Sequence, residues 1–259
     1  MRVVVCLKQV PDSAGIRVDS VSGAVVQAGV ARILNPFDAY ALEEGVRLRE
    51  KLSGECLALT MGPPAAEEML REAIALGADK VLLVTDPGMA KSDTLATARA
   101  LAAAIRKAGE FHVILTGRSS MDGDTAQLGP QLAEVLGIPH VTGVAKIREI
   151  NDRKVVVERL SDAGREVVEA SLPAVLATVK EINEPRLPSL KSKMKAKKDP
   201  VTKWGLADIG LAADAAGANA SVVKTAAPPK RTGGMKWENE DSKAAAKKLA
   251  GELKSRRLI

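Results

Sequence analysis

Short runs of apolar residues alternate with longer amphipathic segments in the first half of the chain, and this alternation restricts the possible folds severely. The runs with the length and continuous apolar character of strands buried on both faces are Arg2–Lys8, Glu55–Met61, Lys80–Val84 and Val113–Thr116. The segments between them place apolar residues at helical spacing. Strands and helices in alternation predict an α/β fold, with a mostly parallel sheet covered by helices on both faces.

The intervening helices have recognisable ends. Asn35 suits an N-cap and Pro36 suits a first helical turn, so a helix is predicted from there to about Leu52. The same patterns predict a hairpin from Val18 to Val26 through Ser22-Gly23, a helix marked by Met69, Ala73 and Leu76, and a helix over Asp93–Ala108.

The spacing of the apolar residues changes after Pro139. Segments separated by turn residues then predict a small antiparallel meander over Val141–Ile150, Lys154–Leu160 and Arg165–Ser171. Ala174–Ala177 returns as a buried strand.

The polar stretch Gly117–Gln131, GRSSMDGDTAQLGPQ, follows the strand Val113–Thr116 and leads into an amphipathic helix. We expect Asp124 or Thr125 to cap that helix, which leaves backbone N–H groups free at its first turn. Such a helix start binds phosphate well. The alternative is an ordinary strand-to-helix turn whose Asp and Thr only cap the helix, because neither standard glycine-rich phosphate fingerprint occurs.

Ligands of parallel sheets bind beyond the carboxyl ends of the strands. The loops expected at that edge are Lys8-Gln9, Asn35–Asp38, Met61–Pro63, Asp86–Thr97 and Gly117–Gln127. The sequence therefore predicts a mononucleotide or dinucleotide lying across these loops.

The two cysteines, Cys6 and Cys56, both lie in apolar runs, which indicates a reducing setting, either the cytosol or an organellar matrix. No signal peptide is recognisable near Met1, and no apolar stretch is long enough to span a bilayer. We therefore expect a cytoplasmic protein without a membrane span.

Positive charge is concentrated late in the chain. Residues 1–190 hold 22 Lys+Arg against 25 Asp+Glu, whereas residues 191–259 hold 16 against 7. Pro185 and Pro188 predict an exposed loop around the lysine run Lys191–Lys198. No aromatic residues are interleaved with these lysines, so a linker or a protein contact is favoured over nucleic acid.

These patterns divide the chain into three regions: an α/β nucleotide-binding domain over 1–186, a basic partner-recognition loop over 187–203, and a C-terminal arm over 204–259. The arm is poor in large apolar residues and contains a predicted short helix over Asp241–Leu253. Such a region buries little by itself, so we expect it to pack on a partner subunit.

No catalytic residue is predicted. His112 and His140 lack the neighbours of a catalytic cluster, and no Cys/His metal spacing occurs. Asp122 and Asp124 suit a cap or a ribose contact better than acid–base work. Any chemistry would therefore be carried by a bound cofactor.

The chain resembles the beta subunit of electron transfer flavoproteins over nearly its whole length. The resemblance depends on motifs in the same order: VVVCLKQVPD, NPFDAYALEEGVRLRE, MGPPAAEEMLREAIALGAD, GRSSMDGDTAQLGP, LPAVLATVKEINEPR, MKAKK and PPKRTGG. It implies a Rossmann-like sheet of the adenine-nucleotide-binding type, a heterodimer with an alpha subunit that binds an FAD, and a C-terminal arm that wraps that subunit.

The family divides by what the beta subunit binds, which is a structural AMP in one type and a second FAD in the electron-bifurcating type. Three features resemble the bifurcating type: the Asp122–Gln127 sequence DGDTAQ, Asp38 after Asn35-Pro36-Phe37, and the hydroxyls of Thr94 and Thr97. Ser119-Ser120 departs from the Gln-Ala expected there, which leaves the backbone cradle as the expected contact.

By this resemblance the cofactor-binding residues would be Cys6, Asn35, Pro36, Phe37, Asp38, Met61, Thr94, Thr97, Gly117, Arg118, Asp122, Gly123, Asp124, Thr125, Ala126 and Gln127. Leu190 would anchor an acyl-CoA dehydrogenase, with Lys191 and Lys193 steering an acidic surface.

The resemblance implies that NADH delivers a hydride to the beta-subunit FAD. One electron would then pass to ferredoxin or flavodoxin, and the other through the alpha-subunit FAD to the acyl-CoA dehydrogenase. The alternatives are a non-bifurcating carrier with structural AMP and, in a different class, a stand-alone adenine-nucleotide sensor.

Overall fold

The structure is a computed structural model that describes residues 1–15, 17–18, 25–26, 29–212, 217–220, 223, 233–238 and 240–259. By its internal contacts the chain forms two compact units, Met1–Thr225 and Ala226–Ile259. The first unit contains the main sheet.

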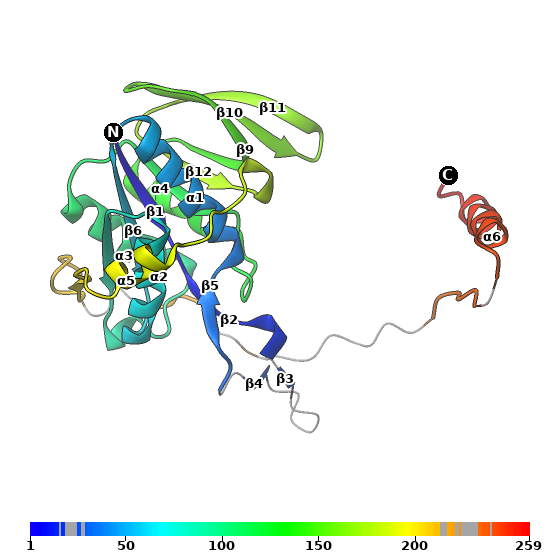
Figure 1. Ribbon diagram of the computed structural model, residues 1–259, viewed down its shortest axis with the longest axis horizontal. Coiled ribbons are helices and arrows are strands. Elements are labelled where there is room, and N and C mark those ends of the chain that lie inside the picture. The colour runs from blue at the N-terminus through cyan, green and yellow to red at the C-terminus, as the bar shows by residue number, and fades with distance from the viewer. Residues whose placement is uncertain are drawn as a thin grey trace. The chain divides into compact units, whose positions relative to one another are not determined.

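Nine strands form that sheet, in the order β11-β10-β9-β12-β8-β1-β6-β7-β13 (Figure 1). In chain order they are β1 (Arg2–Cys6), β6 (Glu55–Met61), β7 (Lys80–Val84), β8 (Val113–Gly117), β9 (His140–Ile150), β10 (Lys154–Ser161), β11 (Gly164–Ser171), β12 (Ala174–Thr178) and β13 (Thr202–Trp204). All neighbours are parallel except the pairs β9–β10 and β10–β11. This is the predicted α/β fold with a mostly parallel sheet and a small antiparallel part.

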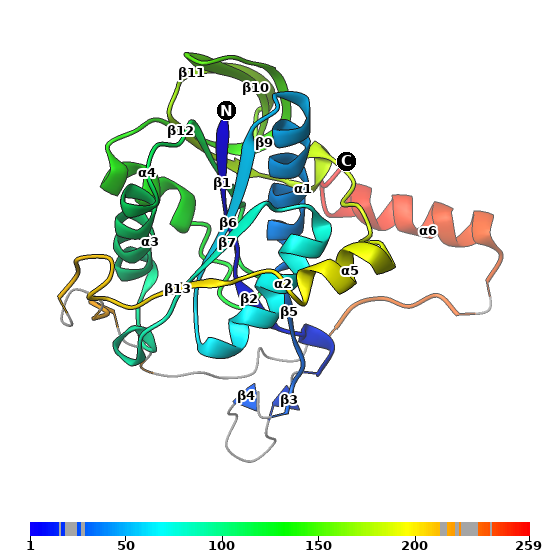
Figure 2. The same ribbon diagram turned by 60° about the vertical axis from the view of Figure 1, so that its left-hand side comes forward.

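Helices cover both faces of the sheet. α1 (Pro36–Lys51) and α2 (Glu67–Leu76) lie on one face, and α3 (Thr94–Ala108) and α4 (Leu128–Leu136) lie on the other (Figure 2). Two separate apolar clusters result, because successive strand residues point to opposite faces. In β1, for example, Val3 and Val5 join the α1/α2 cluster, whereas Val4 joins the α3/α4 cluster.

Smaller elements surround the sheet. They are β2 (Gln9–Pro11) paired with β5 (Arg32–Leu34), β3 (Arg17–Val18) paired with β4 (Val25–Val26), a short helix α5 (Leu190–Ala196), and 3-10 turns at Ser13–Gly15, Pro64–Ala66, Pro87–Met89 and Lys180–Ile182. The β3–β4 pair confirms the predicted hairpin strands, while its expected turn at Ser22-Gly23 lies outside the described residues.

Most predicted elements are confirmed to within one or two residues at either end, but two helix caps differ. The N-cap of α4 is Gln127, without a side-chain cap, so the prediction of Asp124 or Thr125 is wrong. Asp124 and Ala126 have positive φ angles of 43° and 53°, which keeps the chain out of the helix until Leu128. Asn35 occupies the N-cap position of α1, yet its side chain does not cap the helix.

The region after 186 also differs from the prediction. Leu190–Ala196 is a helix rather than an exposed loop, and the Ser189 side chain caps it by accepting the Ser192 N–H. Beyond it, β13 adds to the edge of the main sheet beside β7. Leu206 and Ile209 are buried in the α3/α4 cluster.

The second unit contains the helix α6 (Ser242–Ser255), close to the predicted limits. Asp241 caps it by accepting backbone N–H groups of Lys243 and Ala244. None of the helices among the described residues has the length and apolar character needed to cross a membrane.

Candidate functional site

A cavity of about 250 Å³ opens at the carboxyl edge of the sheet, where a parallel fold is expected to bind ligands. Its walls come from the ends of β1, β6 and β8, the first turns of α1 and α3, and the loop between β8 and α4. These segments are far apart in sequence and meet because their strands are neighbours in the sheet.

Asn35 ties three of these segments together. Its side-chain N–H donates to the carbonyl of Ser119 (2.8 Å), and its side-chain oxygen accepts the N–H of Met121 (3.1 Å). Its backbone N–H donates to the carbonyl of Lys8 (2.9 Å). Asn35 is only 1% exposed, so it fixes the loop after β8 against the end of β1 instead of capping α1.

Asp38 makes a second set of hydrogen bonds between these segments. Its carboxylate accepts the backbone N–H of Lys8 (2.7 Å) and of Gly117 (3.2 Å). Burial raises the pKa of Asp38 to about 7, against the opposing effect of these N–H groups and of Asn35. The same cause raises the pKa of the buried Cys6 thiol to about 12, with a contribution from the charge of Asp38.

The first turn of α1 approaches the end of β8 so closely that position 117 must be a glycine. A Cβ atom at this position would lie 2.5 Å from Oδ1 of Asp38 and 2.7 Å from the carbonyl carbon of Phe37. Only glycine lets the end of β8 touch the first turn of α1 in this way.

Two cations lie at the rim of the cavity, each beside an aspartate: Lys8 pairs with Asp122, and Arg118 lies 4.0 Å from Asp124. Nζ of Lys8 lies 2.7 Å from Oδ1 of Asp122 and 3.3 Å from Oγ of Ser120. The guanidinium of Arg118 lies over the ring of Phe37, 5.3 Å from its centroid. Burial is the largest single effect and would raise the pKa of Asp122, but the hydrogen bonds from Lys8 and Ser120 and the charge of Lys8 together outweigh it and lower that pKa. Two flexible cations at the mouth suit an anionic ligand.

The first turn of α3 forms the opposite wall. Asp93 caps the helix through the N–H of Ala96 (2.9 Å). The Thr94 hydroxyl donates to the Gln127 side chain (2.9 Å), and the Thr97 hydroxyl donates to the Asp93 carbonyl (2.8 Å). The Thr94 bond joins α3 to the start of α4, and the two bonds together occupy the donor protons of both hydroxyls.

The cavity gathers most of the predicted cofactor-binding residues from across the sequence. Those that line it are Cys6, Asn35, Asp38, Met61, Thr94, Thr97, Gly117, Arg118, Thr125, Ala126 and Gln127. Those predicted but absent from its walls are Pro36, Phe37, Asp122, Gly123 and Asp124. Phe37 and Asp122 contact residues that do line the cavity: Phe37 lies under Arg118, and Asp122 pairs with Lys8.

Sequence reasoning did not single out several lining residues as binding residues. Lys8 and Asp93 were in loops assigned to this edge, but nothing marked their side chains. Thr116 and Ser119 carried no signal, since one ends an apolar strand and the other departs from the expected motif. Both line the cavity.

Thr116 and Ser119 supply the clearest sign of a ligand. Thr116 is 2% exposed and Ser119 is 9% exposed, and neither hydroxyl oxygen has a hydrogen-bond partner among the described residues. A buried hydroxyl without a partner is costly, so a polar ligand in this cavity would satisfy both. The described part of the chain contains no cluster of three or more His, Cys, Asp or Glu that could hold a metal ion.

Comparison with known proteins shows the family of the chain. The model of the electron transfer flavoprotein domain matches residues 22–209. The caffeyl-CoA reductase-Etf complex subunit CarD of Acetobacterium woodii is 42% identical, with all of both chains covered. The beta subunits of the electron transfer flavoproteins of Thermoanaerobacterium thermosaccharolyticum and Megasphaera elsdenii are 42% and 40% identical, again over all of both chains.

The chain belongs to the electron transfer flavoprotein beta subunits. The family resemblance of its motifs is thereby confirmed. In this flavoprotein subunit the matched region, residues 22–209, contains the walls of the cavity from α1 onward and also α5.

The residues predicted to contact a dehydrogenase all lie on α5. Leu190 begins the helix and is 77% exposed, and Lys191 and Lys193 follow it on the same short helix. They are separate from the walls of the cavity.

Proposed function

We propose that this chain pairs with an alpha subunit, binds FAD in the cavity, and takes part in flavin-based electron bifurcation. Electrons from NADH would divide between ferredoxin or flavodoxin and, through an FAD on the alpha subunit, an acyl-CoA dehydrogenase. Oxidoreductase activity is expected only of the complex. The two buried thiols, Cys6 and Cys56, support a reducing compartment such as the cytoplasm.

The observation that carries this proposal is the cavity with its two unpartnered hydroxyls. Thr116 and Ser119 would bind polar atoms of the nucleotide. The backbone N–H groups at the start of α4 would bind phosphate, assisted by Lys8 and Arg118 at the rim. Asn35 and Asp38 would keep this cradle in place. Bound FAD would supply the redox chemistry, and no side chain here is assigned an acid or base role.

The volume of the cavity favours a second candidate as well. Ligand pockets typically measure about 300–1,000 Å³, so 250 Å³ suits a mononucleotide better than a whole dinucleotide. The cavity would therefore enclose a whole AMP, but only the AMP portion of an FAD. The resemblance of Asp38 and of the DGDTAQ loop to the bifurcating type supports FAD, while the volume supports a non-bifurcating carrier with structural AMP.

No observation favours the third alternative, a stand-alone adenine-nucleotide sensor. The chain is similar over its whole length to proteins named as subunits. We propose that residues 1–186 bind the nucleotide and that 187–203 bind a dehydrogenase through Leu190, Lys191 and Lys193. The arm predicted over 204–259 would pack on the alpha subunit through the residues after Ile209, since Leu206 and Ile209 pack in the α3/α4 cluster of this chain.

The test is the nucleotide content of the complex, purified after coexpression with its alpha subunit. Acid release followed by separation should yield two FAD and no AMP per heterodimer, and addition of NADH should then bleach the flavin absorbance. One FAD and one AMP would refute the bifurcating proposal and leave the simple carrier. Two FAD without bleaching by NADH would refute the assignment of the electron donor.

A further inference from the structure

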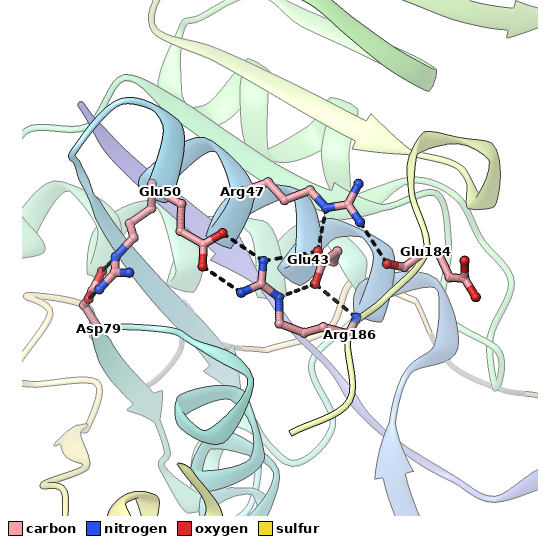
Figure 3. A network of polar contacts seen from close by, with 7 residues as sticks. Glu43, Arg47, Glu50, Asp79, Glu184 and Arg186 are labelled. Atoms are coloured by element: carbon pink, nitrogen blue, oxygen red, sulfur yellow. Dashed lines mark hydrogen bonds and ion pairs between the residues drawn. The ribbon is translucent and has the colours of Figure 1, made fainter. Parts of the chain in front are cut away.

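Two arginines outside the cavity hold the two ends of the segment that contains α5. Arg186 lies just before this segment and binds two carboxylates of α1 (Figure 3). Its Nε and Nη2 donate to Glu43 (2.8 and 3.3 Å), and its Nη1 and Nη2 donate to Glu50 (2.7 and 3.0 Å). Its backbone N–H also donates to Glu43 (3.1 Å).

This arrangement is more than an exposed ion pair. The Glu43 side chain is only 4% exposed and also accepts from Arg47. Burial alone would raise the pKa of Glu43, but the hydrogen bonds from Arg186 and Arg47 outweigh it and lower that pKa. Arg47 donates in turn to the carbonyl of Glu184 (3.1 Å), so α1 holds the approach to α5 at several points.

Arg71 on α2 holds the other end. Its Nη1 donates to the carbonyls of Ala196, Lys197 and Asp199 (2.9, 3.1 and 3.1 Å), which lie where α5 ends. Its Nε and Nη2 bind Glu67, one turn earlier on α2. The guanidinium thus satisfies carbonyls that the end of a helix leaves without partners.

Between these two contacts, α5 has one buried residue and two exposed apolar ones. Ala196 is 2% exposed, whereas Leu190 and Met194 are 77% and 62% exposed, and Leu187 just before the helix is 92% exposed. Leu190 and Met194 are four residues apart, so they share one face of the helix. A seven-residue helix is too short to be stable by itself, so its shape must depend on its packing against α2 and on the contacts at its ends.

We propose that Arg71 and Arg186 are positioning residues that keep α5 folded and oriented before an acyl-CoA dehydrogenase binds, so that Leu190 and Met194 are presented as a rigid apolar contact. This rests on the proposed docking role of α5. A segment that is already ordered avoids the entropy cost of ordering during binding, and this raises affinity without adding a contact.

The first test needs no dehydrogenase. In the purified heterodimer, amide hydrogen exchange over residues 187–199 should become at least about tenfold faster in Arg186→Met and in Arg71→Met. Glu50→Gln should cause a smaller increase, because it removes one partner of Arg186 and leaves the buried Glu43 paired. Arg148→Met is the matched control, since it breaks a 2.8 Å pair with Glu158 in the meander. Equal exchange in all the variants and the wild type would overturn the proposal.

The second test measures electron transfer to a purified acyl-CoA dehydrogenase. Both arginine variants should raise the KM for the dehydrogenase about tenfold while kcat and nucleotide content stay unchanged. Leu190→Ala tests docking separately. If it raises the KM and the arginine variants do not, the positioning role is refuted and the docking role stands. If it leaves the KM unchanged, the docking role fails, and the positioning proposal for docking fails with it.

Discussion

Gly117→Ala tests how the cavity is built. The added Cβ would lie 2.5 Å from Oδ1 of Asp38, 2.7 Å from the carbonyl carbon of Phe37 and 2.9 Å from the Asp38 nitrogen. Two of these neighbours are backbone atoms, so a side-chain rotation cannot relieve the clash. The end of β8 must move away from α1, and the N–H of Gly117 then loses its bond to the Asp38 carboxylate.

The expected loss in the free energy of unfolding follows from these two effects. Overpacking of a tight site typically costs about 1–3 kcal/mol. Losing a hydrogen bond to a buried charged group adds about 1.5–3 kcal/mol. Replacing glycine by alanine reduces the conformational entropy of the unfolded chain, which stabilises the folded protein by about 0.4–1 kcal/mol. We expect a net loss of about 3 kcal/mol in the free energy of unfolding, which at urea m-values of about 1–3 kcal/mol/M lowers the unfolding midpoint by about 1–3 M.

Gly123→Ala is the control in the same loop. Its Cβ would meet only Oγ of Ser120 at 3.5 Å and Cγ2 of Thr125 at 4.0 Å, which are ordinary contacts, and its φ is not positive. Urea unfolding followed by circular dichroism, together with the nucleotide content of the purified heterodimer, should separate the two variants. Equal midpoints and equal nucleotide content in both would refute the reasoning.

Three further outcomes are expected. Thr116→Val should leave the nucleotide-free protein at least as stable, because it removes a buried hydroxyl without a partner, and should weaken nucleotide binding about fivefold to tenfold in calorimetric titration. Burial raises the pKa of Asp38 from 3.8 to about 7, so the folded protein retains a proton that the unfolded chain releases, and stability should fall as pH rises through this window. Asp38→Asn should reduce that fall, as measured by urea midpoints at about pH 5 and pH 8; an unchanged pH dependence would contradict the assignment. The KM for the dehydrogenase should rise with salt, and should do so less steeply in a Lys191→Ala, Lys193→Ala double variant, because screening weakens steering by these lysines.

The elements that the sequence predicted well are those whose burial is set locally. β6 and β7 match their predicted limits because each is a continuous apolar run. α1 matches to within a residue because Pro36 opens it. In such segments the side-chain pattern and the tertiary environment agree, so the pattern alone decides the structure.

The features that the sequence did not predict depend on residues distant in the chain. The Asn35 side chain looked like a helix cap, but its partners lie in the loop after β8. The segment of α5 was predicted to be a loop because of its lysines and the prolines before it, yet Arg71, more than a hundred residues earlier, binds the carbonyls at the end of the helix. The positive φ angle of Ala126 has no signature in residue type, so the start of α4 could not be located.

The position of β1 in the sheet also bears on folding during synthesis. β1 precedes both of its neighbours in the chain, since β6 begins at Glu55 and β8 begins at Val113. One edge of this apolar strand thus stays unpaired until Val113 and the residues after it have left the ribosome. At about 5–20 residues per second, this happens roughly 5–20 s after β1 itself has emerged. During that interval the nascent chain presents an apolar strand edge, a feature that favours aggregation and chaperone binding. Translational pauses between β6 and β8 would lengthen this exposure, whereas pauses after β8 would not.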